Sequence, residues 1–259
     1  MVESPRLPAG YVKSLERGLA VIACFSADRP KLTLSEVARQ VGLSRAAARR
    51  SLITLQTLGY VRSEGRDFYL TPRVLTLGYA YLSSLSLADV AQAHLTNLAN
   101  EVHESCSASV LDDSDIVYVA RAATKRIMTI SLSVGTRLPA YATSMGRVLL
   151  AALRDDRLDA YLDNATLAPL TERTIVDRDR LRTEVERTRT RGWCLVDQEL
   201  EDGVRSIAVP VHDAAGRVVA AVNTSAHATR VPLTTLQRSF LPKLRNCAAA
   251  IDAELRAVR

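Results

Sequence analysis

The sequence lacks any arrangement of cysteines that would support a disulfide framework or a zinc site. Its four cysteines stand singly, and no CxxC or paired Cys/His motif occurs; they are Cys24, Cys106, Cys194 and Cys247. We therefore expect reduced thiols that are mostly buried, because a free cysteine behaves as a small apolar side chain. We expect no metal ion and no other cofactor.

Long apolar runs are also missing. No stretch reaches 18 apolar residues, so no transmembrane helix is predicted, and the N-terminal MVESPRLPAG lacks the apolar core of a signal peptide. We expect a cytoplasmic protein with no membrane partner. The 259 residues are 47% hydrophobic and 24% charged, which is typical of a globular chain with one large domain or two ordinary ones.

Motifs that carry enzyme chemistry are absent too. The sequence contains no GxSxG, HExxH, P-loop or GxGxxG, and its four histidines are isolated. The carboxylate pairs Asp112–Asp113 and Asp155–Asp156 fall at a predicted turn and a predicted helix start, where capping accounts for them. The sequence therefore argues against an enzyme.

Acidic residues are missing from one further place, the segment 37–63. Residues 1–80 hold twelve Lys and Arg against six Asp and Glu, whereas residues 81–259 hold 22 of each. The whole net charge of +6 thus lies in the first third of the chain. This asymmetry predicts a basic N-terminal module that meets a polyanion, and a neutral remainder with another role.

The basic module reads as a winged helix-turn-helix domain. Thr33 and Glu36 form a capping box at the start of a short helix, and Gly42 suits the left-handed turn that ends it. Ser44 can cap a second helix that runs to Gly59. A helix precedes the pair, predicted by the helical spacing of Leu15, Leu19, Ile22 and Phe25 after Ser14, a candidate N-cap. A hairpin over 60–72 follows the pair, with its turn at Glu64–Gly65.

The second helix has the composition of a DNA recognition helix. Ala48, Leu52 and Leu55 form its buried stripe, while Arg and Ala occupy the other faces. A bare helix nearly fills the major groove, so small residues give clearance and arginines reach bases or phosphates. The predicted DNA contacts are Ser44, Arg45, Ala46, Arg49 and Arg50 on this helix, with Arg62 and Arg66 on the hairpin. Helical spacing makes Ala46 and Arg50 point most directly away from the buried stripe, with Arg45 and Arg49 on its flank. The alternative is a helix pair that packs only against protein.

The remainder alternates helical segments with strands at hairpin spacing. Helices that flank an antiparallel sheet make it an α+β domain. We predict three parts: a winged helix-turn-helix domain over 1–72, a linker helix over 73–86 that is a candidate dimer contact, and a second domain over 87–259. Specific DNA sites need two copies at helical-turn spacing, so we expect a dimer or a larger assembly.

Across almost its whole length the chain resembles the IclR family of bacterial transcription regulators. The resemblance rests on SLERGLAVIACF, the helix-turn-helix, PAYATSMGRVLLA (139–151) and RGWCLVDQELEDGVRSIAVPVHDAAGRVVAAVNTSA (191–226). It is closest to regulators of protocatechuate, 4-hydroxybenzoate and β-ketoadipate breakdown. The resemblance implies a GAF/profilin-like effector-binding domain, homodimers that pair into tetramers, a double-stranded DNA operator, and a small carboxylate effector of one of those three types.

The strands of the second domain offer independent support for a ligand site. Ser206, Asn223 and Ser225 interrupt strands otherwise built from Val and Ala, and apolar walls with a few polar groups are typical of a small-molecule pocket. The alternative is a strand end that turns toward solvent. By resemblance the effector contacts are Ser144, Met145, Val196, Ser206, Asn223 and Ser225. Val196 departs from relatives that carry an acid there, which weakens any transfer of their keto-acid effectors.

A carboxylate effector would need a cationic partner as well as the free N–H groups of the helix that begins near Ser144. Arg137 is the first candidate and Arg121 the second, with a surface ion pair as the alternative for each. Two rival functions remain open. One is a regulator whose second domain only forms oligomers, and the other is a small-molecule enzyme fused to a DNA-binding domain.

Overall fold

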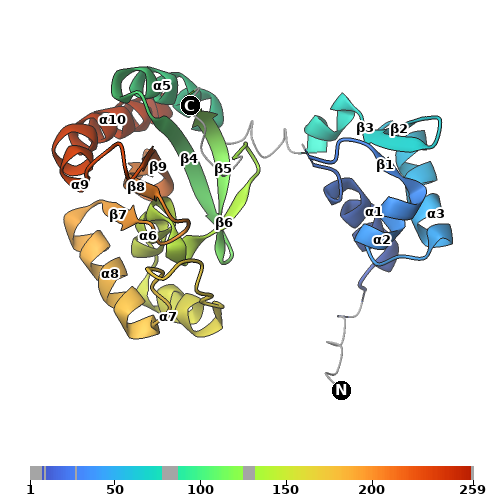
Figure 1. Cartoon of the computed structure of the whole chain (residues 1–259), viewed down its shortest axis with the longest axis horizontal. Helices are drawn as coiled ribbons and strands as arrows, with labels where there is room; N and C mark the ends of the chain where they lie inside the picture. Colours follow the sequence, from blue (N-terminus) through green and yellow to red (C-terminus); the bar gives the residue numbers. More distant parts are fainter. Residues whose placement is uncertain (1–7, 9, 27, 78–86, 125–131, 258–259) are drawn as a thin grey trace. The chain divides into compact units, whose positions relative to one another are not determined.

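The computed structural model divides the chain into two compact units, Met1–Ser83 and Ser84–Arg259 (Figure 1). It describes all residues except 1–7, 9, 27, 78–86, 125–131 and 258–259. Most of the predicted linker helix therefore lies outside the described residues, as does the greater part of 126–135, where the sequence RIMTISLSVG predicts a strand.

Unit 1 consists of three helices and a small antiparallel sheet whose strand order is β1-β3-β2. Its elements are α1 (Lys13–Ala23), β1 (Leu32–Thr33), α2 (Leu34–Gln40), α3 (Arg45–Thr57), β2 (Val61–Glu64), β3 (Asp67–Leu70) and a 3-10 turn, η1 (Pro72–Val74). The order of helices and hairpin confirms the winged helix-turn-helix prediction.

The helix caps and the turn glycine that the sequence predicts are present in the structure. The Thr33 hydroxyl accepts from the backbone N–H of Glu36, and the Glu36 carboxylate accepts from the backbone N–H of Thr33 at 2.7 Å, which completes the capping box. Gly42 has a φ of 62°, a left-handed value that glycine adopts without strain. The Ser44 hydroxyl accepts from the backbone N–H of Ala47 at 3.2 Å and so begins α3.

The core of unit 1 contains the predicted stripe of α3. Ala48, Leu52 and Leu55 are its buried residues, and they pack with Val37, Ala38, Val21, Leu32 and Val61. The first helix is different from its prediction. It begins at Lys13 after Val12 rather than after a Ser14 cap, and its Leu15 and Leu19 are 62% and 55% exposed.

Unit 2 is built on one six-stranded antiparallel sheet with the order β6-β5-β4-β9-β8-β7. Its elements are α5 (Leu87–Val102), β4 (Ser105–Asp112), β5 (Asp115–Ala122), β6 (Arg137–Pro139), η2 (Ala140–Ala142), α6 (Ser144–Ala151), α7 (Asp155–Asn164), α8 (Arg178–Arg191), β7 (Cys194–Asp197), β8 (Val204–His212), β9 (Val218–His227), α9 (Leu233–Thr235), a π-helical turn η3 (Leu236–Phe240) and α10 (Leu241–Ala257).

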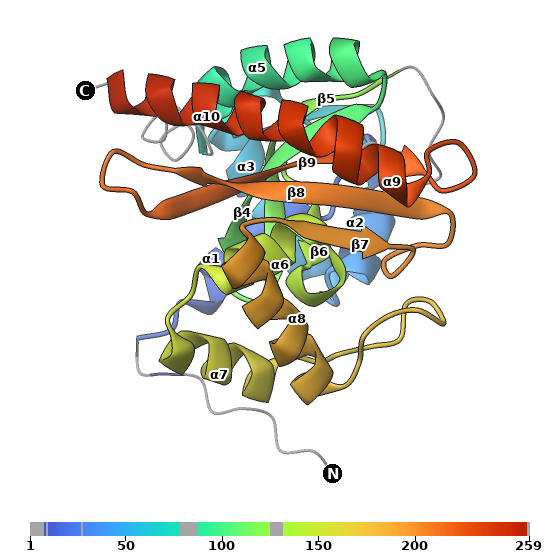
Figure 2. The same cartoon turned by 90° about the vertical axis from the view of Figure 1, so that its left-hand side faces the viewer.

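Helices cover both faces of this sheet. Figures 1 and 2 show α5 and α10 side by side on one face, while α6 lies against the other face with α7 and α8 beyond it. The predicted α+β architecture with an antiparallel sheet is therefore confirmed.

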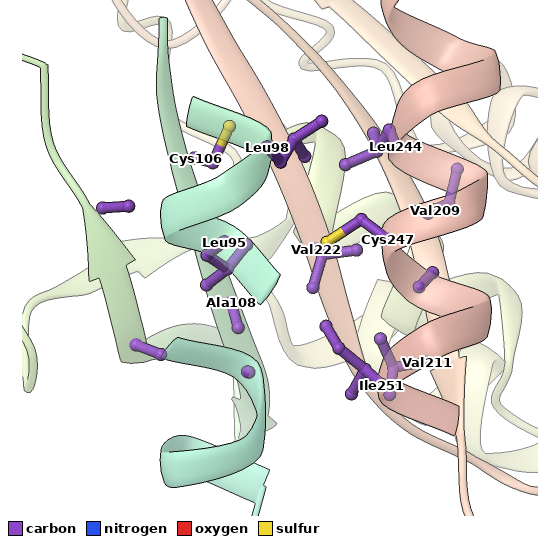
Figure 3. Close-up of a cluster of buried hydrophobic side chains, with 14 of the residues drawn as sticks. Leu95, Leu98, Cys106, Ala108, Val209, Val211, Val222, Leu244, Cys247 and Ile251 are labelled. Carbon is purple, nitrogen blue, oxygen red and sulfur yellow. The ribbon is translucent and has the colours of Figure 1, made fainter. Parts of the chain in front are cut away.

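The α5/α10 face holds a continuous apolar core. Side chains of both helices meet inward-facing strand residues there, among them Leu95, Leu244, Val209 and Val222 (Figure 3). Cys106 and Cys247 lie in the same core, and burial raises the pKa of each thiol to about 12. All four cysteines are free, as the sequence predicted.

Candidate functional site

The outer face of α3 presents the predicted DNA contacts to solvent. Ser44, Arg45, Ala46, Arg49 and Arg50 are all exposed. In the described part of unit 1 the ion pairs are Lys13–Glu16 and Lys31–Glu64, so none of the three arginines is neutralised by an acid. An unpaired guanidinium on a slim helix is free to meet a phosphate or a guanine edge.

Arg50 is exposed, and its side chain also lies beside a groove in unit 1. Together with Ala47 and Ser51 it lines a groove of about 720 Å³ between α1 and α3. Helical spacing alone made Arg50 the most outward of the three arginines, whereas in the structure it lies at the border of this groove. Arg45 and Arg49 lie on the remaining outer surface of α3, and Ser44 caps its first turn.

The hairpin carries a second basic cluster. Arg62 on β2 and Arg66 in the turn are exposed, and the Arg62 guanidinium lies 4.3 Å from the centre of the Tyr69 ring. Lys31 lies 5.6 Å from the same ring, because β1 pairs with β3 and adds a third strand to the wing. The sequence reading missed Lys31, since a two-residue strand gives no periodic signal.

The arginines of the two units are held differently. In unit 2 many arginines pair with a carboxylate; they are Arg137, Arg147, Arg154, Arg173, Arg182, Arg187, Arg189, Arg191, Arg205, Arg217 and Arg230. In unit 1 the described arginines form no such pair. The excess charge of the first unit is therefore available to a polyanion.

A second candidate site lies on the α6 face of the unit 2 sheet, where polar side chains cross neighbouring strands in rows. The register places Arg121 opposite Ser107 and Ser107 opposite Asn223. The next row places Ser105 opposite Ser225 and Ser225 opposite Ser206. We call these residues, together with Ser109 on β4 and Ser144 at the start of α6, the polar cluster.

Strand β4 contributes the part of this cluster that the sequence reading overlooked. Ser105, Ser107 and Ser109 alternate with Cys106 and Ala108, and all three hydroxyl-bearing residues are buried. Serines at a period of two put hydroxyl groups on one face of a strand. That pattern was readable in SCSAS and could have located the site.

Arg121 is the cationic member of the polar cluster. Its Nη1 donates to the Ser107 hydroxyl at 3.3 Å, while its Nε is buried without a partner within the described structure. Partial burial lowers the pKa of Arg121, although an arginine remains charged at neutral pH. This guanidinium forms no ion pair among the described residues, so its N–H groups can donate to the carboxylate of a ligand.

Asn223 provides a second unsatisfied group. The residue is 4% exposed, its Nδ2 donates to the Ser225 hydroxyl at 3.0 Å, and its Oδ1 is buried with no partner in the described part of the chain. A buried polar atom without a partner costs roughly 1–3 kcal/mol. Two such atoms on one face mark a place where a polar ligand would compensate.

The first turn of α6 closes the polar cluster. The hydroxyl groups of Ser144 and Ser206 lie 2.8 Å apart, and Met145 is fully buried with its sulfur 3.3 Å from the Ser109 hydroxyl. Thr143 caps the helix by accepting from the Gly146 N–H at 3.1 Å. Val196 of β7 lies opposite Ser206 of β8. Its side chain is 3% exposed and adds an apolar wall to the cluster.

A buried ion pair fixes α6 in this position. Arg147 is 1% exposed, its Nε donates to the Tyr141 carbonyl at 2.9 Å, and its two terminal nitrogens donate to the Glu199 carboxylate. The Glu199 carboxylate also accepts a hydrogen bond from the backbone N–H of Ile175. The backbone carbonyl of Glu199 accepts one from the Thr174 hydroxyl. One arginine thus joins α6 to two loops.

Arg137, the first candidate from sequence, has a different environment. It is exposed on β6, and its guanidinium donates to the carboxylates of Asp112 and Asp115 at the β4–β5 turn. These contacts raise the pKa of Arg137, with the Asp112 hydrogen bond as the main cause. This is the surface ion pair that the sequence left open as the alternative.

The described residues of both units contain neither a metal-binding group nor a membrane-spanning helix. No group of three His, Cys, Asp or Glu side chains that could hold a metal ion occurs among them. No helix within the same described ranges is long and apolar enough to cross a bilayer.

Comparison with protein-family models assigns both units. Residues 14–65 match the IclR helix-turn-helix domain, and residues 79–253 match the bacterial transcriptional regulator IclR C-terminal domain. The two matches together cover most of the chain.

Individual relatives agree with this assignment. The chain is 49% identical to the Pca regulon regulatory protein of Pseudomonas putida over 90% of this chain and 81% of the relative. A solved structure of a transcriptional regulator from Rhodococcus sp. RHA1 is 56% identical with a TM-score of 0.86, covering 96% of this chain and 100% of that one. A double mutant of the PobR inducer-binding domain from Acinetobacter, in complex with 3-hydroxybenzoic acid, is 35% identical with a TM-score of 0.60, covering 66% and 99%. The chain belongs to the IclR family of bacterial transcriptional regulators.

Proposed function

We propose that this chain is a ligand-responsive transcription regulator of an operon for aromatic-acid catabolism in the β-ketoadipate pathway. Unit 1 binds a double-stranded DNA operator, and unit 2 binds a small carboxylate of the protocatechuate, 4-hydroxybenzoate or β-ketoadipate type. The similarity to the Pca regulon regulatory protein and to an inducer-binding domain that holds 3-hydroxybenzoic acid supports both the pathway and the ligand class. A cytoplasmic location follows from that role.

The DNA contacts fall on two elements. Arg45 and Arg49 read the major groove from α3, with Ser44 and Ala46 close to the DNA surface and Arg50 at the edge. Arg62 and Arg66 hold phosphates from the wing. Support comes from the exposure of these side chains and from the absence of acidic partners for them among the described residues of unit 1.

The effector occupies the polar cluster. Two buried atoms of this cluster, Arg121 Nε and Asn223 Oδ1, have no partner among the described residues, and this observation carries the assignment. Arg121 takes the carboxylate and Asn223 a polar group of the ligand. The remaining contacts are Ser144, Met145, Val196, Ser206 and Ser225. Arg121 replaces Arg137 as the first choice, because the Arg137 guanidinium already has two carboxylate partners.

The rival functions fit these observations less well. A second domain that served only to form oligomers would have no reason to bury, on one face of its sheet, a guanidinium nitrogen and an amide oxygen that both lack a partner among the described residues. An enzyme fused to a DNA-binding domain finds no support in the relatives, which are transcriptional regulators.

The functional unit contains two or more copies of the chain, organised as a winged helix-turn-helix domain over 1–72, a linker over 73–86 and an effector domain over 87–259. The α1–α3 groove is lined by Leu15, Leu19, Leu58 and Leu77 among others, all well exposed. Unit 1 of a second copy is the occupant that we propose, since paired DNA half-sites require two recognition helices.

Thermal denaturation of the full chain with each of the three acids tests the ligand assignment. A ligand at 100 times its Kd stabilises a protein by about 2.7 kcal/mol, which raises Tm by roughly 5–10 °C at this size. We expect Arg121→Met to abolish the shift and Arg137→Met to retain it. If all three acids leave the wild-type Tm unchanged, the chain does not sense these compounds.

A further inference from the structure

The backbone of Arg121 is held by a side chain rather than by a neighbouring strand. β6 pairs with β5 only over Asp115–Val117, so the outer edge of β5 is free of β6 at Arg121. Gln92 of α5 occupies this edge. The Arg121 N–H donates to Gln92 Oε1 at 3.2 Å, and Gln92 Nε2 donates to the Arg121 carbonyl at 3.2 Å.

These two hydrogen bonds determine how the Arg121 side chain meets the polar cluster. Because both backbone groups of Arg121 point away from β4, Arg121 and Ser107 form a non-hydrogen-bonded antiparallel pair, in which side chains lie closer together. The bond from Arg121 Nη1 to the Ser107 hydroxyl is consistent with that geometry. The Gln92 amide thus acts as a strand residue would, and it sets the position of the guanidinium.

The helix that carries Gln92 is the first element along the chain in the described part of unit 2. It begins at Leu87, directly after the segment 78–86 that connects the two units in sequence. The described ion pairs of α5 are His94–Glu254 and Glu101–Lys243, and both join this helix to α10. Among the described side chains of α5, Gln92 is the one that hydrogen-bonds the backbone of a ligand-facing residue.

We propose that Gln92 is the positioning residue through which an effector held by Arg121 acts on α5 and thereby changes operator affinity. The inference rests on the proposed function, since it requires an effector at Arg121. An effector that draws the guanidinium toward itself shifts the β5 edge, and the paired hydrogen bonds carry that shift to α5. The coupling between the two sites is a ratio: operator affinity with saturating effector divided by operator affinity without it.

The test measures this ratio in the full-length protein by fluorescence anisotropy with labelled operator DNA. The effector is whichever of 4-hydroxybenzoate, protocatechuate or β-ketoadipate shifts the wild-type Tm. We expect Gln92→Ala to retain its Tm and its effector-free operator affinity, since Gln92 is exposed, while the ratio falls toward one from a wild-type value of about 5–150. Gln92→Glu can accept from the Arg121 N–H but cannot donate to its carbonyl, so its ratio should be intermediate.

Glu101→Ala is the matched control, because it removes a polar contact of α5 with α10 and leaves Arg121 untouched. It should retain the wild-type ratio. A wild-type ratio in Gln92→Ala at effector saturation overturns the proposal, even if effector affinity falls, and so does an equal loss in Glu101→Ala. A wild-type protein whose operator affinity is unchanged by all three acids would instead refute the proposed function.

Discussion

At the scale of single residues, Arg49 tests the DNA-reading surface most directly. It is exposed on α3 and has no ion-pair partner in the described structure, so its removal leaves the fold intact. We expect Arg49→Ala to weaken specific operator binding by about 1–3 kcal/mol, roughly 5- to 150-fold, if it contacts a base. Anisotropy titration measures the loss, and circular dichroism checks the fold.

The matched control for Arg49 is Arg157→Ala. Arg157 is an exposed arginine on α7 of unit 2 that lies in no predicted site. Its removal changes the net charge by the same amount, so it should leave operator affinity close to wild type. Wild-type affinity in Arg49→Ala would remove Arg49 from the reading surface.

Arg62 on the wing should behave differently from Arg49. Its guanidinium stacks on the Tyr69 ring at the outer surface of the hairpin, where a phosphate is the expected partner. We expect Arg62→Ala to weaken specific and non-specific DNA binding to a similar extent. The slope of log affinity against log salt should fall by about 1, since one phosphate contact is lost. A loss confined to the operator sequence would contradict the phosphate assignment.

At the scale of elements, the Arg147–Glu199 pair holds α6 against two loops and so shapes the polar cluster. Both groups are buried, so the removal of one leaves an uncompensated charge. We expect Glu199→Ala to reduce the free energy of unfolding by about 3–5 kcal/mol, measured by urea denaturation. The double variant Arg147→Met with Glu199→Met removes both charges, so it should be more stable than Glu199→Ala. A double variant less stable than Glu199→Ala would refute this account.

Elements whose signals are local were predictable from the sequence. The capping box of Thr33 and Glu36, the Ser44 cap and the wing hairpin depend on residues close together in the chain, and each is present. The two arginine candidates show the limit. Arg137 and Arg121 both sit on strands, and only the register of β4, β5 and β9 reveals that one meets carboxylates while the other meets serines.

A second limit appears in α1. Its apolar spacing correctly indicated a helix, but spacing does not say which partner an apolar stripe has. Val21 is buried in the unit 1 core, whereas Leu15 and Leu19 remain on the surface. A sequence reports that a face is apolar, and only a structure shows which of its residues the core of the unit buries.

At the scale of the whole molecule, that exposed stripe bears on assembly. Most of the large apolar side chains that are exposed among the described residues lie in the first 77 positions; those in unit 1 are Tyr11, Val12, Leu15, Leu19, Ile53, Leu58, Leu75 and Leu77. Exposed apolar surface of this extent on a small unit is typical of an interaction site. The groove between α1 and α3 adds the concave shape that an inserted partner needs.

Leu19→Glu tests whether this surface pairs two copies of the chain on DNA. Leu19 lines the groove and is 55% exposed, so a carboxylate there is tolerated by the monomer but is buried without a partner in a paired form. We expect the Tm of the free protein to change little and operator affinity to fall at least tenfold. The stoichiometry on a single half-site should be unaffected, because the reading face of α3 is unchanged. Sedimentation velocity with operator DNA distinguishes one bound copy from two, and a wild-type complex formed by Leu19→Glu would place the pairing surface elsewhere.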